Sequence, residues 1–165
     1  MLFSQKNAVI MIADVNTTVS GNTELNSVNM ALYDHATFII QIASTLVIAS
    51  TAQITLESAT SDSGDTADVT FHYRISTATQ ATLSSAGTYG ADATASLISI
   101  ASAADFAGKT VLLEVDGDEL RSSTAGVVYN WVTVDIESGI TTGRISAYAI
   151  LSNPRFAGAS MPVAI

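Results

Sequence analysis

The feature that most restricts the fold of this chain is a repeated alternation of apolar and polar residues. Residues 68–76, 110–116, 129–137 and 144–151 each place apolar side chains at every second position, with mostly polar ones between them. Successive side chains of a β-strand point to opposite faces, so this period predicts half-buried strands. Clusters of Gly, Ser, Asp and Thr separate the stretches. The pattern predicts an all-β fold, an antiparallel β-sandwich, with a jelly roll among the topologies that fit.

Two earlier stretches are apolar on both faces. Residues 36–44 and 45–58 are dense in Ile, Val and Thr, and no charge occurs from Ala36 to Leu56. They predict buried central strands, with an amphipathic helix as the rival interpretation. Residues 7–13 and 95–102 predict two further strands. Residues 102–108 predict a short helix, with a serine cap at its start and a glycine at its end.

The length and the ends of the chain predict its domain organisation. A chain of 165 residues fits one domain. Alternation stops after Leu151, and both prolines, Pro154 and Pro162, follow it. We therefore expect residues 1–152 to form a single β-sandwich domain and residues 153–165 to form an extended C-terminal arm.

The composition points to contact with protein rather than with nucleic acid or lipid. Charged residues make up 13% of the chain, whereas about 25% is usual. The formal net charge is −9, and a chain with so few basic residues does not suit nucleic acids or anionic membranes. A Ser- and Thr-rich surface with little charge indicates burial against other subunits, although a monomer with such a surface is the plainer alternative.

The N-terminus and the lack of cysteine restrict the setting of the chain. No cysteine is present, which excludes disulfides and Cys-ligated metals. The N-terminal stretch has one basic residue, Lys6, and a short apolar run that ends before Asp14, unlike a signal peptide. Apolar stretches are too short for a membrane span. We therefore expect synthesis in the cytoplasm and no membrane partner.

Signals for catalysis are weak. His35 and His72 are the only histidines, and no G-x-S-x-G nucleophile elbow occurs. We predict that His72 is a solvated cross-strand residue and that His35 belongs to a turn. The acidic segments 62–65 and 115–120 do not fit a complete calcium loop. We expect no enzyme activity, no metal and no cofactor, with a hydrolase that uses a carboxylate pair as an alternative.

Three aromatic residues suggest a functional surface. Tyr129 and Trp131 share one face of a predicted strand, and Tyr148 is expected on an adjacent strand that faces the same way. Such residues occur in cores, at subunit interfaces and on platforms that stack against sugar rings, and we rank the three roles in this order. A sugar platform would make the chain a carbohydrate-binding or tail-associated adhesion module, which is the alternative function.

The C-terminal third of the chain resembles a family of small phage head proteins. A strand that ends in an acidic turn (110–120) is followed by a Gly-containing turn (122–126) and by two more strands (127–136 and 143–151). The chain closes with Asn-Pro-Arg-Phe and a Met-Pro-x-Ala-Ile end. The family typically ends in a Pro-Arg-Tyr-type motif, and Phe156 takes the tyrosine position here. Its members are thought to be capsid decoration, or cement, proteins.

The resemblance covers roughly residues 109–165. It implies a virion structural protein, made in the host cytoplasm, that binds the major capsid protein on the outer surface of the capsid. A homotrimer at local three-fold positions is expected by the same analogy. Arg155 and Phe156 are the expected anchor pair of the arm, unless the arm packs on its own domain. The interface residues predicted from the sequence are Tyr129, Trp131, Tyr148, Arg155 and Phe156.

Overall fold

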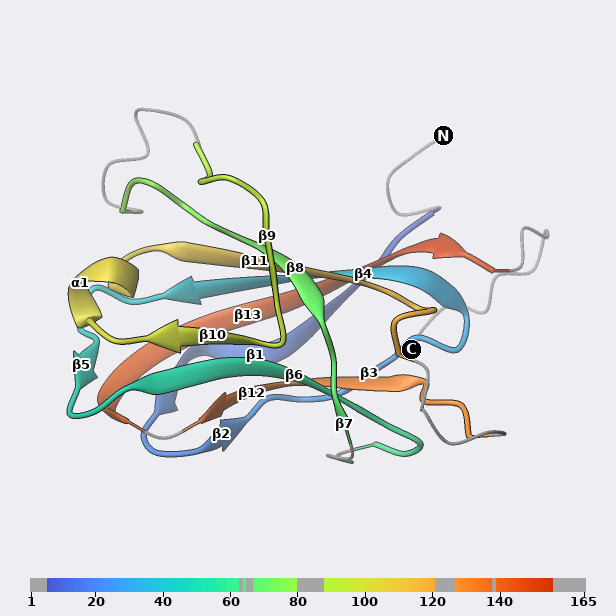
Figure 1. The fold of residues 1–165 in the computed structure, drawn as a ribbon, viewed down its shortest axis with the longest axis horizontal. Helices are drawn as coiled ribbons and strands as arrows, with labels where there is room; N and C mark the ends of the chain where they lie inside the picture. Colours follow the sequence, from blue (N-terminus) through green and yellow to red (C-terminus); the bar gives the residue numbers. More distant parts are fainter. Residues whose placement is uncertain are drawn as a thin grey trace.

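A computed structural model describes residues 6–62, 64, 67–79, 88–120, 127–137 and 139–155. They form two β-sheets packed face to face, with a short helix, α1 (Ala103–Phe106), at one end of the two layers (Figure 1). The described strand pairs are antiparallel. The all-β antiparallel sandwich that the alternation predicts is therefore confirmed.

The strands divide into two sheets, here called sheet A and sheet B. Sheet A has the order β1-β13-β4-β11-β8-β9, with β5 beside β13. Its strands are β1 (Ala8–Val19), β4 (Tyr33–Ile42), β5 (Val47–Ile48), β8 (Phe71–Ile75), β9 (Ala93–Ala95), β11 (Thr110–Asp116) and β13 (Ile140–Pro154). Sheet B has the order β10-β6-β12-β2, with β3 beside β12 and β7 beside β6. Its strands are β2 (Thr23–Glu24), β3 (Val28–Asn29), β6 (Ala52–Ala59), β7 (Ala67–Asp68), β10 (Leu97–Ile100) and β12 (Trp131–Glu137).

Apolar side chains fill the space between the sheets. Phe38 on β4 lies opposite Leu113 on β11 and Ala149 on β13, and none of the three is exposed. Burying a large aliphatic or aromatic side chain contributes about 1.5–3 kcal/mol. Every second residue of each central strand therefore holds the two sheets together. Sheet B contributes the matching layer of Ile54, Leu56, Val132, Val134 and Ile136.

Two short strands, β7 and β10, together fill one position beside β6. β7 pairs with Glu57 and Ser58, and β10 pairs with residues 52–55. Between them, the backbone N–H of Val69 donates to the carbonyl of Leu56 at 2.8 Å. After Val69 the chain leaves sheet B, and β8 and β9 extend sheet A beyond β11 (Figure 1).

The prediction of one strand over residues 68–76 is therefore wrong. The chain passes from sheet B to sheet A between β7 and β8. The alternation does not reveal this crossing, because Val69 and Phe71 both point into the core, with 2% and 0% exposure. A period of two indicates which side chains are buried, but it does not indicate which sheet they belong to.

The other predicted elements agree with the structure more closely. Residues 36–44 fall within and just after the central strand β4, and residues 45–58 contain β5 and most of the central strand β6, with turn residues between them. The side chain of Ser102 accepts a hydrogen bond from the Ala104 N–H and caps α1, as predicted. β13 continues through Pro154, so the first two residues of the predicted arm belong to sheet A. Residues 156–165 lie outside the described residues.

Candidate interaction surface

The outer face of sheet A carries a group of apolar side chains next to its edge strand β1. Met11 on β1 lies opposite Tyr148 on β13. Tyr148 lies opposite Ile39 on β4, and Ile39 lies opposite Leu112 on β11. A second row starts with Val9 opposite Ile150. The name "apolar face" is used for these six residues: Val9, Met11, Ile39, Leu112, Tyr148 and Ile150.

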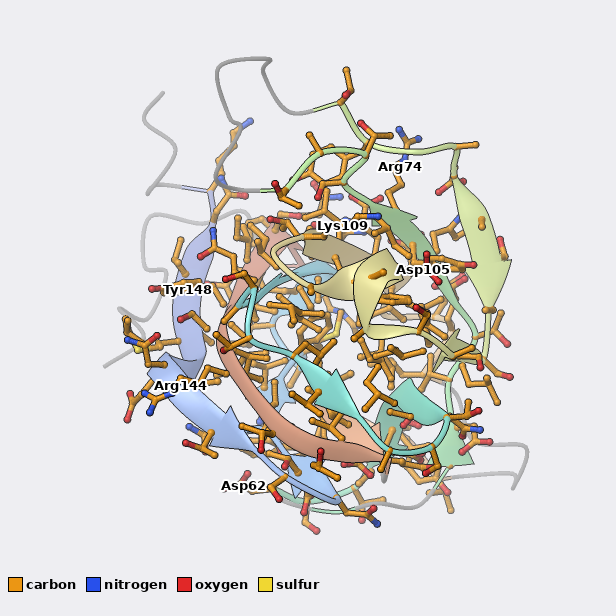
Figure 2. The ribbon with its side chains drawn as sticks, turned by 90° about the vertical axis from the view of Figure 1, so that its left-hand side faces the viewer. Asp62, Arg74, Asp105, Lys109, Arg144 and Tyr148 are labelled. Atoms are coloured by element: carbon orange, nitrogen blue, oxygen red, sulfur yellow. The ribbon has the colours of Figure 1, made fainter. Side chains whose placement is uncertain are left out.

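Water reaches this face. Val9 and Met11 are 58% and 46% exposed, and the other four side chains are half-buried. In Figure 2, Tyr148 projects on the side of the molecule where β1 lies. A sheet face that meets only solvent usually carries polar residues in these positions. The apolar face therefore has the composition of a surface that another protein covers.

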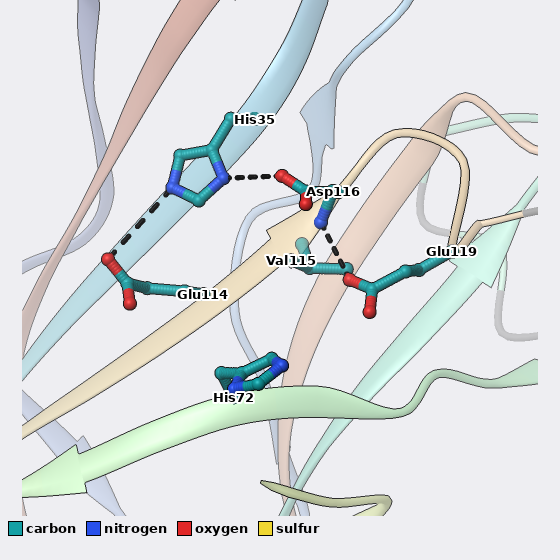
Figure 3. Close-up of a pocket in the computed structure, with 6 residues that line it drawn as sticks. All are labelled: His35, His72, Glu114, Val115, Asp116 and Glu119. Atoms are coloured by element: carbon teal, nitrogen blue, oxygen red, sulfur yellow. Dashed lines mark hydrogen bonds and ion pairs between the residues drawn. The ribbon is translucent and has the colours of Figure 1, made fainter. Parts of the chain in front are cut away.

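The same sheet becomes charged toward β11 and β8. A small pocket there is lined by His35, His72, Glu114, Val115, Asp116 and Glu119. Figure 3 shows the imidazole of His35 between two carboxylates. Its Nδ1 lies 2.7 Å from Oδ1 of Asp116, and its Nε2 lies 3.9 Å from Oε1 of Glu114. Oε2 of Glu119 accepts a hydrogen bond from the Asp116 N–H at 2.8 Å.

A second cluster surrounds Asp92. Its Oδ2 lies 2.9 Å from Nδ1 of His72, and its Oδ1 lies 3.7 Å from Nε of Arg74. The hydrogen bond and the charge of Asp92 raise the pKa of His72. The hydrogen bond from His72 and the nearby positive charges lower the pKa of Asp92. His72 is thus a solvated residue that interacts across the sheet, as predicted.

We expect the substitution Asp92→Asn to lower the pKa of His72 toward its ordinary value, because the carboxylate that stabilises the imidazolium is removed. The measurement is an NMR titration of the His72 ring protons. Asp105→Asn, at an exposed acid on α1, serves as the control and should leave this pKa unchanged. An identical His72 titration in wild type and Asp92→Asn would contradict the assignment.

The two shifts also set the sign of the pH dependence. The raised pKa of His72 adds stability that is fully present below its unfolded-state pKa and is lost as the pH rises through the folded-state pKa. The lowered pKa of Asp92 adds stability that is present above its unfolded-state pKa and is lost as the pH falls through the folded-state pKa. The ion pair should therefore be strongest between the folded-state pKa values of Asp92 and His72.

The placement of His35 differs from the sequence prediction. His35 lies within β4, opposite Asp116 on β11, and not in a turn. The contact between His35 and Asp116 could not be predicted from the sequence, because the sequence does not reveal which strands pair. The six side chains that line the pocket include no hydroxyl or thiol nucleophile. Among the described residues, no three His, Asp or Glu side chains are arranged to hold a metal ion.

The predicted interface residues separate over the molecule. Tyr148 belongs to the apolar face on β13 of sheet A, whereas Trp131 is on β12 of sheet B and pairs with Ala59 and Asn29. Tyr129 packs against the core. The expectation that Tyr148 lies beside Trp131 is wrong, because consecutive strands β12 and β13 belong to different sheets. The aromatic platform does not form as predicted.

Arg155 is held by its own domain. Its Nε lies 2.6 Å from Oδ1 of Asp34, and its backbone N–H donates to the carbonyl of Leu32 at 3.0 Å. The guanidinium also lies against Gly117, where a Cβ atom would meet it. At this residue the chain therefore follows the alternative in which the arm packs on its own domain. Phe156 lies outside the described residues.

Comparison of the chain with family models, curated proteins and solved structures found no match. In the part of the chain that the structure describes, no helix combines the length and the hydropathy that crossing a bilayer requires.

Proposed function

We propose that this chain is a non-enzymatic virion structural protein, a capsid decoration protein with a jelly-roll fold that binds the major capsid protein on the outer surface of the shell. The order of the strands is the main observation in favour. β2 and β3 lie one after the other along β12 and share one position beside it. In the same way, β7 and β10 share one position beside β6. With these pairs counted as one position each, and with β5, β8 and β9 set aside, the described chain runs through eight strand positions.

The pairing of these positions is that of a long hairpin rolled up on itself. The first position pairs with the last, as β1 with β13, and the second pairs with the seventh, as β2 with β12. The third pairs with the sixth, as β4 with β11, and the fourth pairs with the fifth, as β6 with β10. This order supports the proposed jelly roll, a fold that recurs in viral capsid domains and also in lectins and cupins. β8 and β9 are then an insertion into the fifth strand.

The interior of the sandwich favours a role at its surface. Inward-facing residues of the central strands are mainly Val, Ile, Leu, Phe and Ala with little or no exposure. Binding functions that use the interior of such a fold need polar groups there, whereas this interior is a packed core. The apolar face and the low charge of the chain both suit contact with other subunits. No observation brings Trp131, Tyr129 and Tyr148 together as the sugar-binding alternative requires.

The test uses particles of the virus that encodes this chain. We expect quantitative mass spectrometry of gradient-purified particles to find the chain in a fixed ratio to the major capsid protein. Cryo-electron microscopy should locate it on the outside of the shell, and deletion of its gene should lower the temperature at which the particles lose their contents. Absence of the chain from particles, or its presence at the tail alone, would contradict the proposal.

A further inference from the structure

We infer that the apolar face is the docking surface for a second copy of this chain, and that two copies stack their A sheets face to face about a two-fold axis. The inference rests on the outer face of sheet A and holds whether or not the chain decorates a capsid. A symmetric dimer then takes the place of the trimer that the resemblance to phage head proteins implies. The distribution of charge around the apolar face favours a second copy.

The positive group of this face lies at one corner. Arg144 on β13 lies opposite Thr18 on β1, and it alternates with the inward-facing Ile145. It therefore points outward, as Tyr148 does, and Figure 2 shows both on the same side of the molecule. Arg144 is exposed and forms no ion pair with another described residue.

The negative groups lie at the diagonally opposite corner. Glu114 is on β11, two strands from β13, in the row that contains Ile150. Asp116 lies one row further from Arg144. Their side chains are 44% and 62% exposed. The apolar face lies between this acidic corner and Arg144. Positive charge, apolar surface and negative charge therefore follow one another along a diagonal of sheet A.

This pattern complements itself. A two-fold axis through the apolar face, perpendicular to the diagonal, sets the positive corner of each copy over the acidic corner of the other. The charge contact forms twice by symmetry, and apolar side chains meet apolar side chains between the two contacts. A chain with a net charge of −9 repels its own copies elsewhere on its surface, so this orientation is selected against others.

A ring of three would need a different arrangement. In a three-fold ring each contact joins two different surfaces of the chain. The apolar face would then need a second apolar surface as its complement. The other large exposed apolar residues among the described positions are spread over separate elements, as Val15, Leu32, Val47, Tyr89, Leu97 and Val128. A face that meets its own copy requires a two-fold axis.

The test is sedimentation velocity of the purified full chain over a concentration series. We expect a monomer–dimer equilibrium in the wild type. Met11→Glu places a charge on the apolar face and should raise the dimer Kd by about 10-fold or more. Leu97→Glu is the matched control on sheet B, since Leu97 is 41% exposed and Met11 46% exposed. This control should leave the Kd unchanged. Circular dichroism melts verify that both variants fold.

A charge exchange tests the orientation of the two copies. Arg144→Glu alone should weaken the dimer, and Arg144→Glu combined with Glu114→Arg should restore it. Within one copy these residues are separated by β4 and by several rows of the sheet, so rescue requires a contact between copies. A wild-type chain that stays monomeric, a trimer, or a Met11→Glu variant with an unchanged Kd would each overturn the inference. A monomeric chain in a decorated particle would overturn it and leave the proposed function intact.

Discussion

Replacing Phe38 by alanine is expected to lower the free energy of unfolding by about 3–5 kcal/mol, because the change leaves a large cavity in the centre of the sandwich. Phe38 has 0% exposure and lies on the central strand β4, with Leu113 and Ala149 on either side. A domain has a total stability of about 5–15 kcal/mol, so this one change removes a large share of it. The measurement is urea unfolding followed by circular dichroism.

Ile39→Ala is the matched control for this prediction. Ile39 is the next residue on β4 and is half-buried on the outer face of the same sheet. The Ile39→Ala variant should lose only about 1 kcal/mol of unfolding free energy, because the removed carbon groups are only partly buried and their removal leaves no enclosed cavity. The comparison is made at low protein concentration, where self-association does not contribute. Equal losses for the two variants would contradict the register of β4, since a slip of one residue exchanges the two faces.

The burial of this fold could be predicted from the sequence alone in most strands. In β11 the alternation places Val111, Leu113 and Val115 together, and all three are buried in the core. The same holds for alternate residues of β12 and β13. Side-chain direction in a strand depends on the local backbone, which has a fixed period, so a single sequence contains this information.

The pairing of strands could not be predicted from the sequence in this way, because it depends on contacts between distant parts of the chain. β1 pairs with β13, and β4 lies between β13 and β11. No local pattern near Met11 indicates that Tyr148 is its neighbour. The apolar face is therefore invisible in the sequence, where its six residues are distributed over four stretches. The separation of Trp131 from Tyr148 has the same origin, since consecutive strands need not share a sheet.

The contacts of His35 also could not be predicted from the sequence, because they too depend on which strands pair. His35 and Asp116 meet because β4 and β11 are neighbours, although many residues separate them in the chain. An isolated histidine in a sequence is usually solvated or structural, and this general expectation described His72 correctly. It could not show that both imidazoles line one pocket together with three carboxylates. The position of such a cluster follows from strand order and register, not from residue type.

The second large loss of stability is expected at the turn between β12 and β13, which packs against the backbone of residues 50 and 51. Gly139 joins β12 to β13 with φ of 97°, and its carbonyl accepts a hydrogen bond from the Ala49 N–H at 2.8 Å. A Cβ atom at Gly139 would lie 2.6 Å from the carbonyl oxygens of Ser50 and Thr51. These are backbone atoms, which cannot rotate away as a side chain does. The turn and the segment before β6 must therefore separate if any side chain is added.

We expect Gly139→Ala to lower the free energy of unfolding by about 2–5 kcal/mol. The positive φ contributes about 1–2 kcal/mol of strain, and the overpacking contributes about 1–3 kcal/mol more. Gly21→Ala isolates the first contribution, because Gly21 has φ of 69° and nothing within 4 Å of an added Cβ. Its loss should be about 1–2 kcal/mol. Urea unfolding of both variants measures the difference, and equal losses would show that the β12–β13 turn does not pack on residues 50 and 51.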